Sequence, residues 1–517
     1  MMVKWLASSG VAAFALLAAS PAAAAECADL SSLALPDGKV TSASVVAAGA
    51  FQPPAGAGGP PGVAAGRYAN LPAFCRVQAT LTPSSDSDIK SEVWMPTSGW
   101  NGKYVGIGNG IWAGTISYGE LGAALARGYA VAATDTGHTG NGLTAEFAVG
   151  HPEKLVDFGH RAVHETAVTA KRAIEAFYGR APSHSLWNSC STGGRQGLMA
   201  AYRYPEDYDA ISAMAPANPM TDLMTQSMWA GWQPQRAPGA ALSVPQLAAV
   251  HRAAVAKCDK DDGLEDGVIG RPDACTFDPG TVSGLSSEQA ETMRAIYRGP
   301  PGLPGWPAGS ELQLALLTQG QQPFPVALTY FTMLAFADRA GWDWRTFDYT
   351  ADVQAGRAYG AGILDVPATG LAAFFARGGK LLLSHGWTDG LIPATNALRF
   401  HGGLLPTLSP QQAAGQYRLF MVPGMDHCGG GEGASQFDTL GTIDEWATTG
   451  IAPERIVATR PTAVGGPPGA PPAPPREPMS RPLCPYPQFA QFNGTGDTKE
   501  ASSFTCVAPA KVAGERG

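Results

Sequence analysis

Two of the eight cysteines constrain the fold of this chain strongly, because each stands beside a residue that could do chemistry. Cys190 precedes Ser191, and Cys428 follows His427. Bridged cysteines have Cα atoms only about 4.4–6.8 Å apart. A Cys190–Cys428 disulfide would therefore hold the serine hydroxyl and the imidazole in one neighbourhood, although the sequence places them far apart.

The start of the chain has the pattern of a signal peptide. Lys4 precedes an apolar run over 5–18, and small residues fill 20–25. The run is shorter than the roughly 20 apolar residues that span a bilayer. We expect cleavage near Ala25, so that 1–25 is a signal peptide and the mature protein is secreted or periplasmic.

All eight cysteines follow that segment, and their number is even. In an exported protein this favours four disulfides over free thiols. The sequence alone cannot fix the connectivity. Proximity along the chain suggests three local bridges and leaves the fourth to the two cysteines beside the serine and the histidine: Cys27–Cys75, Cys258–Cys275, Cys484–Cys506 and Cys190–Cys428.

Short apolar segments alternate with helical ones on both sides of Ser191. We expect strands at 103–107, 129–134, 185–187, 210–214, 380–383 and 417–422, with helices at 161–178 and 193–202. Short apolar runs are typical of buried parallel strands. Their alternation with helices predicts a doubly wound α/β core.

The segment 218–364 interrupts this alternation with Pro-Gly clusters and many aromatic residues. We interpret it as a lid inserted between two parts of the core, 26–217 and 365–517. Most of its aromatic residues should form the lid's own core, with two or three lining a pocket. They include Trp229, Trp232, Phe324, Tyr330, Phe331, Trp342 and Trp344.

Ser191 lies in a segment, 188–194, that reads as a sharp turn from a strand to a helix. A serine needs a general base, and the base needs a third group that fixes its tautomer. In α/β hydrolases these residues come in the order Ser, acid, His. Here Asp389 and then His427 follow Ser191, which predicts a Ser191–His427–Asp389 triad. The Gly-x-Ser-x-Gly motif is degenerate, because Ser189 stands at the first Gly position.

Other residues compete for these roles. Asp426 is a rival acid, but a neighbour of the histidine cannot easily reach its Nδ1 atom. His385 and His138 are expected to be structural residues hydrogen-bonded near the site.

The segments 190–197, 385–389, 423–428 and 481–487 together resemble the tannase and feruloyl esterase family, which also includes a bacterial mono(2-hydroxyethyl) terephthalate hydrolase. The similarity runs over nearly the whole mature chain. It implies an α/β-hydrolase fold with a large lid, a Ser191–Asp389–His427 triad and Cys190–Cys428 as the family's site disulfide.

An oxyanion needs two backbone donors. We expect the amide of Thr192 as one donor and an amide of the loop 108–111 as the other. Both Gly110 and Ile111 stay open as that second donor. Similar family members tend to carry Gly where Ile111 stands.

A second cluster, 258–268, places carboxylates at short spacings among glycines, which suits a hard cation with oxygen ligands. The alternative is a solvated acidic turn. In the resembling family a calcium loop in the lid has this pattern. The resemblance implies a structural calcium ion held by the carboxylates of Asp259, Asp262 and Asp266 and the carbonyls of Leu264 and Val268.

The resemblance implies hydrolysis of an aromatic ester, such as a hydroxycinnamate or plant-polymer-derived ester. Tannase and terephthalate-monoester hydrolase are alternatives, and Arg345 is a loose candidate for binding a free carboxylate. A non-catalytic calcium-binding protein and an amidase are alternatives of other classes. A net charge of −8 argues against nucleic acid as a partner. We expect no membrane partner and no redox or nucleotide cofactor; the oligomeric state cannot be read from the sequence.

Overall fold

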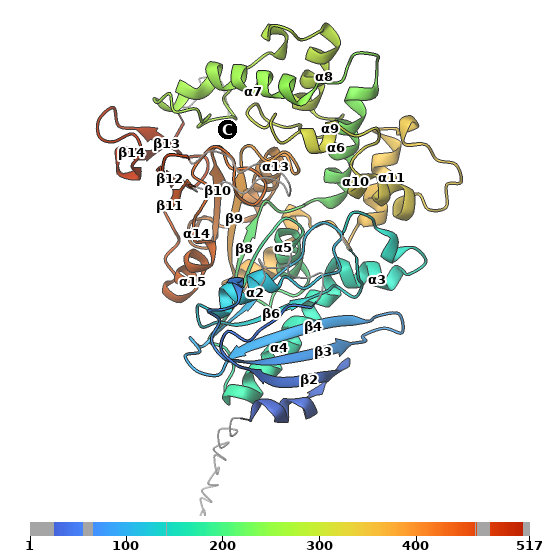
Figure 1. Ribbon diagram of the computed structural model, residues 1–517, viewed down its shortest axis with the longest axis vertical. Helices are drawn as coiled ribbons and strands as arrows, with labels where there is room; N and C mark the ends of the chain where they lie inside the picture. Colours follow the sequence, from blue (N-terminus) through green and yellow to red (C-terminus); the bar gives the residue numbers. More distant parts are fainter. Residues whose placement is uncertain (1–24, 55–65, 141, 461, 463–475, 510–517) are drawn as a thin grey trace, which may run out of the picture.

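The computed structural model describes residues 25–54, 66–140, 142–460, 462 and 476–509. The predicted signal peptide, 1–25, lies outside the described residues except for Ala25. A ten-stranded sheet forms the centre of the molecule, in the order β1-β2-β3-β4-β6-β5-β7-β8-β9-β10 (Figure 1). Its strands are β1 (Ala34–Leu35), β2 (Gly38–Val46), β3 (Phe74–Leu81), β4 (Ile89–Pro96), β5 (Lys103–Gly106), β6 (Ala130–Thr134), β7 (His184–Cys190), β8 (Ala210–Met214), β9 (Lys380–Gly386) and β10 (Tyr417–Val422).

The sheet has an antiparallel part and a parallel part. Strands β1 to β4 pair antiparallel, and β4 pairs antiparallel with β6. From β6 through β5, β7, β8 and β9 to β10 all neighbours are parallel. The parallel part contains every strand predicted from the apolar runs, and β8 and β10 have the predicted bounds. The α/β architecture is therefore confirmed.

Alternate residues of the parallel strands enter two different cores, one on each face of the sheet. In β9, Leu381 and Leu383 belong to one apolar cluster, whereas Leu382 belongs to the other. Since successive side chains of a strand point to opposite faces, a continuous apolar run is what a strand buried on both sides requires.

Helices cover both faces of the sheet. Helices α4, α5, α12 and α13 contribute to the first cluster, and α2 and α15 contribute to the second. The core helices are α2 (Tyr118–Leu125), α3 (Pro152–Val156), α4 (Ala162–Tyr178), α5 (Thr192–Arg203), α12 (Ala372–Ala376), α13 (Thr395–Leu404), α14 (Pro410–Gly415) and α15 (Thr439–Thr449).

The segment 218–364, between β8 and α12, is largely helical and lies over the upper end of the sheet (Figure 1). Its helices are α6 (Met220–Trp232), α7 (Val244–Cys258), α8 (Ser287–Arg298), α9 (Ala315–Thr318), α10 (Pro325–Thr329) and α11 (Ala351–Gly360). Apolar residues of α6, α7 and α8 belong to a separate cluster, which includes Val250, Met293 and Ile296. We call the segment 218–364 the lid.

Two small antiparallel pairs complete the fold near the C-terminus. They are β11 (Ile456–Thr459) with β12 (Ser480–Leu483) and β13 (Phe489–Phe492) with β14 (Phe504–Val507). All eight cysteines are paired, in the predicted bridges Cys27–Cys75, Cys190–Cys428, Cys258–Cys275 and Cys484–Cys506.

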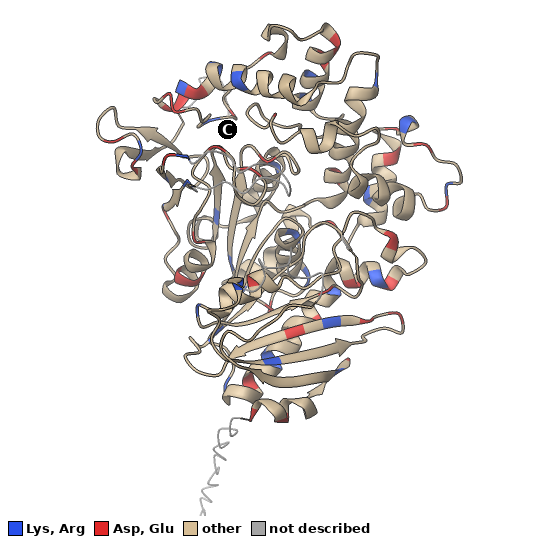
Figure 2. Ribbon diagram, in the orientation of Figure 1, with Lys and Arg blue, Asp and Glu red and all other residues tan. Residues whose placement is uncertain are grey.

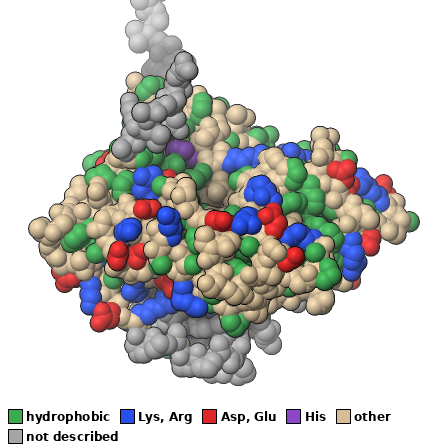
Figure 3. All heavy atoms as spheres, turned by 90° about the horizontal axis from the view of Figure 1, so that it is seen from above, with side chains coloured by type: hydrophobic (Ala, Val, Ile, Leu, Met, Phe, Trp, Pro, Cys, Tyr) green, Lys and Arg blue, Asp and Glu red, His purple; other side chains and the backbone are tan. Residues whose placement is uncertain are grey.

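Lys and Arg positions are interspersed with Asp and Glu positions along the ribbon of core and lid (Figure 2). The face seen from above shows the same mixture, with small groups of hydrophobic side chains between the charges (Figure 3). In the part of the chain that the structure describes, no helix combines the length and the apolarity needed to cross a membrane.

A buried histidine attaches the lid to the core. His251 of α7 lies between Glu311 of the lid and Glu432, with Nδ1 and Nε2 at 3.0 and 2.8 Å from the two carboxylates. Glu432 follows His427 on the same loop. Because both partners only accept hydrogen bonds, both ring nitrogens must donate, and the ring carries a positive charge. Burial alone would lower the pKa of His251, but the two carboxylates raise it to about 9.

Replacement of His251 by Gln should destabilise the protein in a pH-dependent way. The folded-state pKa lies above the ordinary value of 6.5, so the stabilisation is complete below that value and is lost as pH rises through about 9. We expect His251→Gln to lower the free energy of unfolding by about 3 kcal/mol near pH 6 and by much less near pH 9.5. Urea unfolding at both pH values measures this difference.

His151 provides the control, because its side chain is half-exposed and pairs with Asp86 at the surface. Such pairs contribute about 0–1 kcal/mol, so His151→Gln should cost little at either pH. An equal loss for His251→Gln at both pH values would contradict the charged bridge.

Candidate active site

Ser191 occupies a strained turn between the end of β7 and the start of α5. Its φ and ψ angles are +63° and −126°, and a positive φ costs a residue other than Gly about 1–3 kcal/mol. The Ser191 amide donates to the carbonyl of Met214 at 2.9 Å, and its carbonyl accepts from the amide of Ala217 at 3.1 Å. The end of β8 therefore holds the turn in place.

The residues around Ser191 are small because the turn leaves no space. A Cβ atom on Gly193 would lie 2.1 Å from the Ser189 hydroxyl, and one on Gly194 would lie 2.6 Å from the Met214 carbonyl. The Ser189 hydroxyl accepts from the Gly108 amide at 3.3 Å. A serine thus fits at the first Gly position of the motif because the missing side chain of Gly193 makes room for it.

The structure brings Ser191, His427 and Asp389 together. His427 Nδ1 lies 2.7 Å from Asp389 Oδ2, and its Nε2 lies 3.0 Å from Ser191 Oγ. The Asp389 side chain is fully buried, while 19% of the His427 side chain is exposed. With Nδ1–H donating to the carboxylate, Nε2 is left to accept the serine proton.

The electrostatics of the pair keep Asp389 ionised. Burial alone would raise the pKa of Asp389, but His427 and His385 together hold it well below its ordinary value. Burial would likewise lower the pKa of His427, but the Asp389 carboxylate raises it above 6.5. His427 therefore becomes a stronger base than a free imidazole.

Further contacts fix the carboxylate of Asp389. Its Oδ1 accepts from the amides of Leu391 and Ile392 at 2.9 Å each. Its Oδ2 lies 3.2 Å from Nε2 of His385, which is fully buried. The sequence analysis placed His385 near the site but did not connect it to Asp389. The spacing of four residues between them was the available signal.

The Cys190–Cys428 bridge joins the serine turn to the histidine loop. Its Cα atoms are 5.9 Å apart. Ser191 directly follows one of the bridged cysteines and His427 directly precedes the other, so the bridge keeps the two residues close. Cys428 also has a positive φ, of +63°. The bridge thus ties together two strained segments.

The two expected oxyanion segments meet. The Thr192 hydroxyl donates to the carbonyl of Ile111 at 2.9 Å. The Thr192 amide is at the first position of α5, where backbone N–H groups have no intrahelical acceptor. Ala113 closes a turn onto the carbonyl of Gly110 at 2.9 Å, with Ile111 inside it. The contact between Thr192 and Ile111 does not decide whether the Gly110 amide or the Ile111 amide is the second oxyanion donor.

A polar pair that the sequence analysis missed holds this loop against α5. The Asn109 amide donates to Gln196 Oε1 at 3.0 Å, and Gln196 Nε2 donates to Asn109 Oδ1 at 3.1 Å. The Asn109 carbonyl accepts from the Gly193 amide at 2.8 Å. Gln196 follows Ser191 by little more than one helical turn, so only the fold reveals its partner.

A cleft opens beside Ser191, with about 440 Å³ of empty space when the part open to solvent is included. Its wall is apolar apart from Ser191, His427 and the hydroxyl groups of Thr192 and Ser227. It is lined by Ile111, Ser191, Thr192, Ala217, Met220, Leu223, Met224, Ser227, Phe324, Val326, Leu391, Ile392 and His427. His427 is the one residue of this lining that can carry a charge.

Fewer lid aromatics reach the cleft than the sequence analysis expected. Of the seven named above, Phe324 lines it. Tyr330, Phe331 and Trp344 are buried in a cluster that the lid forms with residues of the core. Arg345 is outside the lining; its exposed side chain pairs with Asp343 and lies over Trp344.

Asp426 faces away from the imidazole. Its two oxygens accept from Gln313 Nε2 and from the Thr388 hydroxyl, at 2.8 Å each. His138 is buried and stacks on Phe147, as a structural residue would.

A family model described as tannase and feruloyl esterase matches residues 75–319 and 328–507. The chain belongs to this family. An uncharacterised esterase of Xanthomonas campestris pv. campestris is 35% identical over 96% of this chain and 94% of that protein. A probable feruloyl esterase B-2 of Aspergillus terreus is 30% identical over 84% of this chain and 86% of that protein.

Solved structures agree with this assignment. Feruloyl esterase B from Aspergillus oryzae superposes with a TM-score of 0.81 at 26% identity, covering 93% of this chain and 100% of that one. Tannin acyl hydrolase from Aspergillus niger, at 19% identity and a TM-score of 0.71, shares the fold. This member of the tannase and feruloyl esterase family therefore has an α/β-hydrolase fold with an inserted lid and is a carboxylic ester hydrolase. The alternative of a protein without catalysis is thereby disfavoured.

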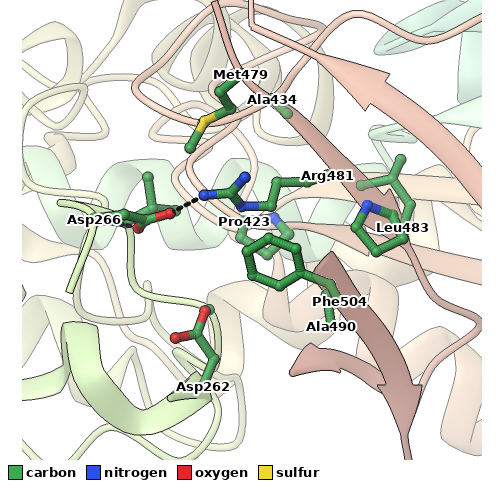
Figure 4. A pocket seen from close by; sticks show the side chains of 13 residues that line it. Asp262, Asp266, Pro423, Ala434, Met479, Arg481, Leu483, Ala490 and Phe504 are labelled. Atoms are coloured by element: carbon green, nitrogen blue, oxygen red, sulfur yellow. Dashed lines mark hydrogen bonds and ion pairs between the residues drawn. The ribbon is translucent and has the colours of Figure 1, made fainter. Parts of the chain in front are cut away.

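The acidic loop of this family member carries the donors that a calcium ion prefers, but most of them face protein partners. Asp259 accepts from the amides of 266, 267 and 268 at 2.8–3.2 Å. Asp262 accepts from the Leu264 amide at 3.1 Å. Asp266 accepts from the Val268 amide at 3.1 Å and pairs with Arg481, which reaches toward it in Figure 4.

The types of ligand atom on this loop favour a calcium ion, but the way the side chains are arranged does not. Burial, together with the charges of Asp266 and Asp259, raises the pKa of Asp262 to about 7, so a cation would relieve repulsion. Within the described ranges, however, no three acidic, histidine or cysteine side chains are grouped to hold a metal ion. Calcium therefore stays a prediction.

Replacing Asp389 by Asn should separate the two candidate acids. Activity requires a neutral His427, so it should rise with pH along an acid limb whose midpoint lies above 6.5. Asp389→Asn removes the charge that raises this pKa. We expect the limb to move to lower pH and kcat to fall by about 10⁴-fold. Initial rates on an activated ester across pH measure both effects.

Asp426→Asn is the matched control. It should leave the acid limb in place, because Asp426 contacts Gln313 and Thr388. A loss of similar size in the two variants would contradict the assignment of Asp389.

Proposed function

We propose that this chain hydrolyses uncharged aromatic carboxylic esters of the feruloyl type through Ser191, with His427 as base and Asp389 as its partner. The observation that carries the proposal is the Ser191–His427–Asp389 hydrogen-bonded chain at the mouth of an apolar cleft. The names of the Aspergillus relatives support the substrate class.

The reaction uses the contacts described above. His427 Nε2 accepts the Ser191 proton while Oγ attacks the ester carbonyl carbon, and the carbonyl oxygen becomes an oxyanion. Breakdown of this intermediate expels the alcohol, which takes its proton from His427, and leaves an acyl group on Ser191. Water then attacks the acyl group with His427 as base, and the acid is released. Asp389 stabilises the imidazolium in both stages.

The oxyanion is stabilised by backbone amides. The Thr192 amide at the start of α5 is one donor, and the helix dipole favours negative charge there. The second donor comes from Gly110 or Ile111. The polar pair Asn109–Gln196 holds that loop against α5 before substrate arrives, so little reorganisation is needed in the transition state.

The cleft lining favours feruloyl-type esters over the two alternatives. A terephthalate monoester carries a free carboxylate, and burying a charge without a partner is strongly unfavourable. Arg345 lies outside the lining. Galloyl groups carry three hydroxyls, whereas apart from the nucleophile the lining offers the hydroxyls of Ser227 and Thr192. A feruloyl group has one hydroxyl and a largely apolar body.

We place the protein outside the reducing cytosol. Four disulfides connect all its cysteines, and disulfides persist in oxidising compartments. The signal peptide predicted at 1–25 gives the route of export. A structural calcium ion on the loop 259–268 is a further part of the proposal, supported by the all-oxygen donor set of three carboxylates.

Ester preference tests the proposed substrate. We expect kcat/KM for methyl ferulate to exceed that for methyl gallate, and that for mono(2-hydroxyethyl) terephthalate to be at least about tenfold lower than for ferulate, since its carboxylate would be buried unpaired. Ser191→Ala should reduce kcat by about 10⁵–10⁶-fold.

Ser189→Ala is the control, because this neighbouring serine makes a structural contact with Gly108; most of the activity should remain. Retained activity in Ser191→Ala would refute the mechanism, and a terephthalate preference would refute the substrate class. An amide analogue of the preferred ester, if hydrolysed as fast, would favour the amidase alternative.

Chelation tests the calcium ion. EDTA should lower the melting temperature by several degrees, and added calcium should restore it, because ligand binding to the folded state stabilises that state. Asp262→Asn should reduce this response. Asp261→Asn, a change at the exposed neighbouring acid outside the predicted ligand set, should not. No response to EDTA, or equal responses in the two variants, would contradict a calcium site.

A further inference from the structure

Ile111 has a backbone conformation that branched residues rarely adopt. Its φ is +44°, and a positive φ in a β-branched residue is a genuine outlier that costs about 1–3 kcal/mol. It follows Gly110 in the turn that the Ala113 amide closes onto the Gly110 carbonyl. Gly, Asn or Asp usually takes such a turn position when φ is positive.

The surroundings hold this conformation from three sides. The next residue, Trp112, is fully buried, and its Nε1 donates to the Val326 carbonyl of the lid at 3.0 Å. The Trp112 amide donates to the Gly142 carbonyl at 3.1 Å. The Thr192 hydroxyl donates to the Ile111 carbonyl at 2.9 Å. The turn therefore cannot relax without breaking contacts to the core, the lid and α5.

The structure also leaves room for the Ile111 side chain. A Cβ atom on Gly142 would lie 2.6 Å from Ile111 Cγ1. Gly142 has a φ of +84°, so the segment that faces Ile111 is itself shaped around it. The side chain lines the cleft together with Ser191, Thr192 and His427.

We propose that Ile111 is a specificity-determining residue whose side chain limits the width of the acyl group beside Ser191. The proposal rests on the proposed function, in which Ser191 attacks the carbonyl carbon and the Thr192 amide binds its oxygen. The leaving alcohol must face His427, which protonates it. The acyl substituent then lies on the other side of the carbonyl, along the wall that Ile111 shares with Thr192.

The test varies acyl width and alcohol width separately in Ile111→Ala. The esters are p-nitrophenyl acetate, p-nitrophenyl 2-naphthoate and 2-naphthyl acetate. We expect the ratio of kcat/KM for the naphthoate to that for p-nitrophenyl acetate to rise about tenfold or more, the range for a few methyl groups in a pocket. The ratio of 2-naphthyl acetate to p-nitrophenyl acetate should stay constant.

Ile116→Ala is the matched control. Ile116 belongs to the same loop region but packs against the core cluster that includes residues of α2 and α15, and it does not line the cleft, so neither ratio should change. An unchanged naphthoate ratio in Ile111→Ala, or equal changes in both ratios, would overturn the proposal. Activated esters remain usable even if methyl ferulate is not hydrolysed, so failure of the substrate class is distinguishable from failure of this inference.

Stability gives a readout that does not depend on activity. Ile111→Gly loses side-chain contacts but relieves the strain at φ +44°, whereas Ile116 is absent from the positive-φ residues of the described chain. Both side chains are partly buried. Ile111→Gly should therefore lower the melting temperature less than Ile116→Gly does. An equal or larger loss would contradict the strain on which the inference depends.

Discussion

The strained turn at Ser191 is the constraint on which the rest of the site depends. A positive φ exposes the hydroxyl between a strand and a helix, but it is stable only where neighbouring groups hold it. The end of β8 supplies hydrogen bonds to both sides of the turn, and the absent side chains of Gly193 and Gly194 let the helix start close to the sheet. The Cys190–Cys428 bridge then extends this rigidity to the histidine loop.

The lid and the histidine loop are connected by two contacts of different chemistry. His251 links α7 to Glu432 through charge, and Gln313 links the lid to Asp426 through a neutral donor. The two acceptors, Asp426 and Glu432, lie on the same loop as His427: Asp426 directly precedes it and Glu432 follows it. The position of the imidazole is therefore set jointly by the core, through the disulfide, and by the lid. Asp426, the alternative acid in the sequence, contacts the lid through Gln313 instead of contacting His427.

The sequence was informative where local pattern decides structure. Apolar runs found the parallel strands because both faces of each strand are buried, and β8 and β10 begin and end as expected. Chain order and the flanking cysteines selected the three residues that the structure joins by hydrogen bonds. By contrast, the antiparallel strands β1–β4 were not predicted. In β2 most residues are partly or fully exposed, so no continuous apolar run marks it.

Properties that depend on tertiary contacts were beyond the sequence pattern. The turn that gives Ile111 its positive φ is held by contacts with Val326, Gly142 and Thr192, which come from separate segments. The contact between His385 and Asp389 requires the loop after β9 to fold back on its strand. The sequence shows that the lid is rich in aromatic residues, but it does not show which way their side chains point. Most of those named pack in a cluster and do not line the cleft.

This last difference changes how an aromatic acyl group would be recognised. Two or three lid aromatics were expected to line the pocket, but the lining offers Phe324 together with Met220, Met224 and branched aliphatic residues. Methionine sulfur contacts aromatic rings favourably, by about 0.3–1.5 kcal/mol, and its flexible chain adapts to different shapes. Selectivity then has to come from a stiffer part of the wall. Ile111 is β-branched and its turn is held from three sides, so the shape of this part of the wall adjusts little.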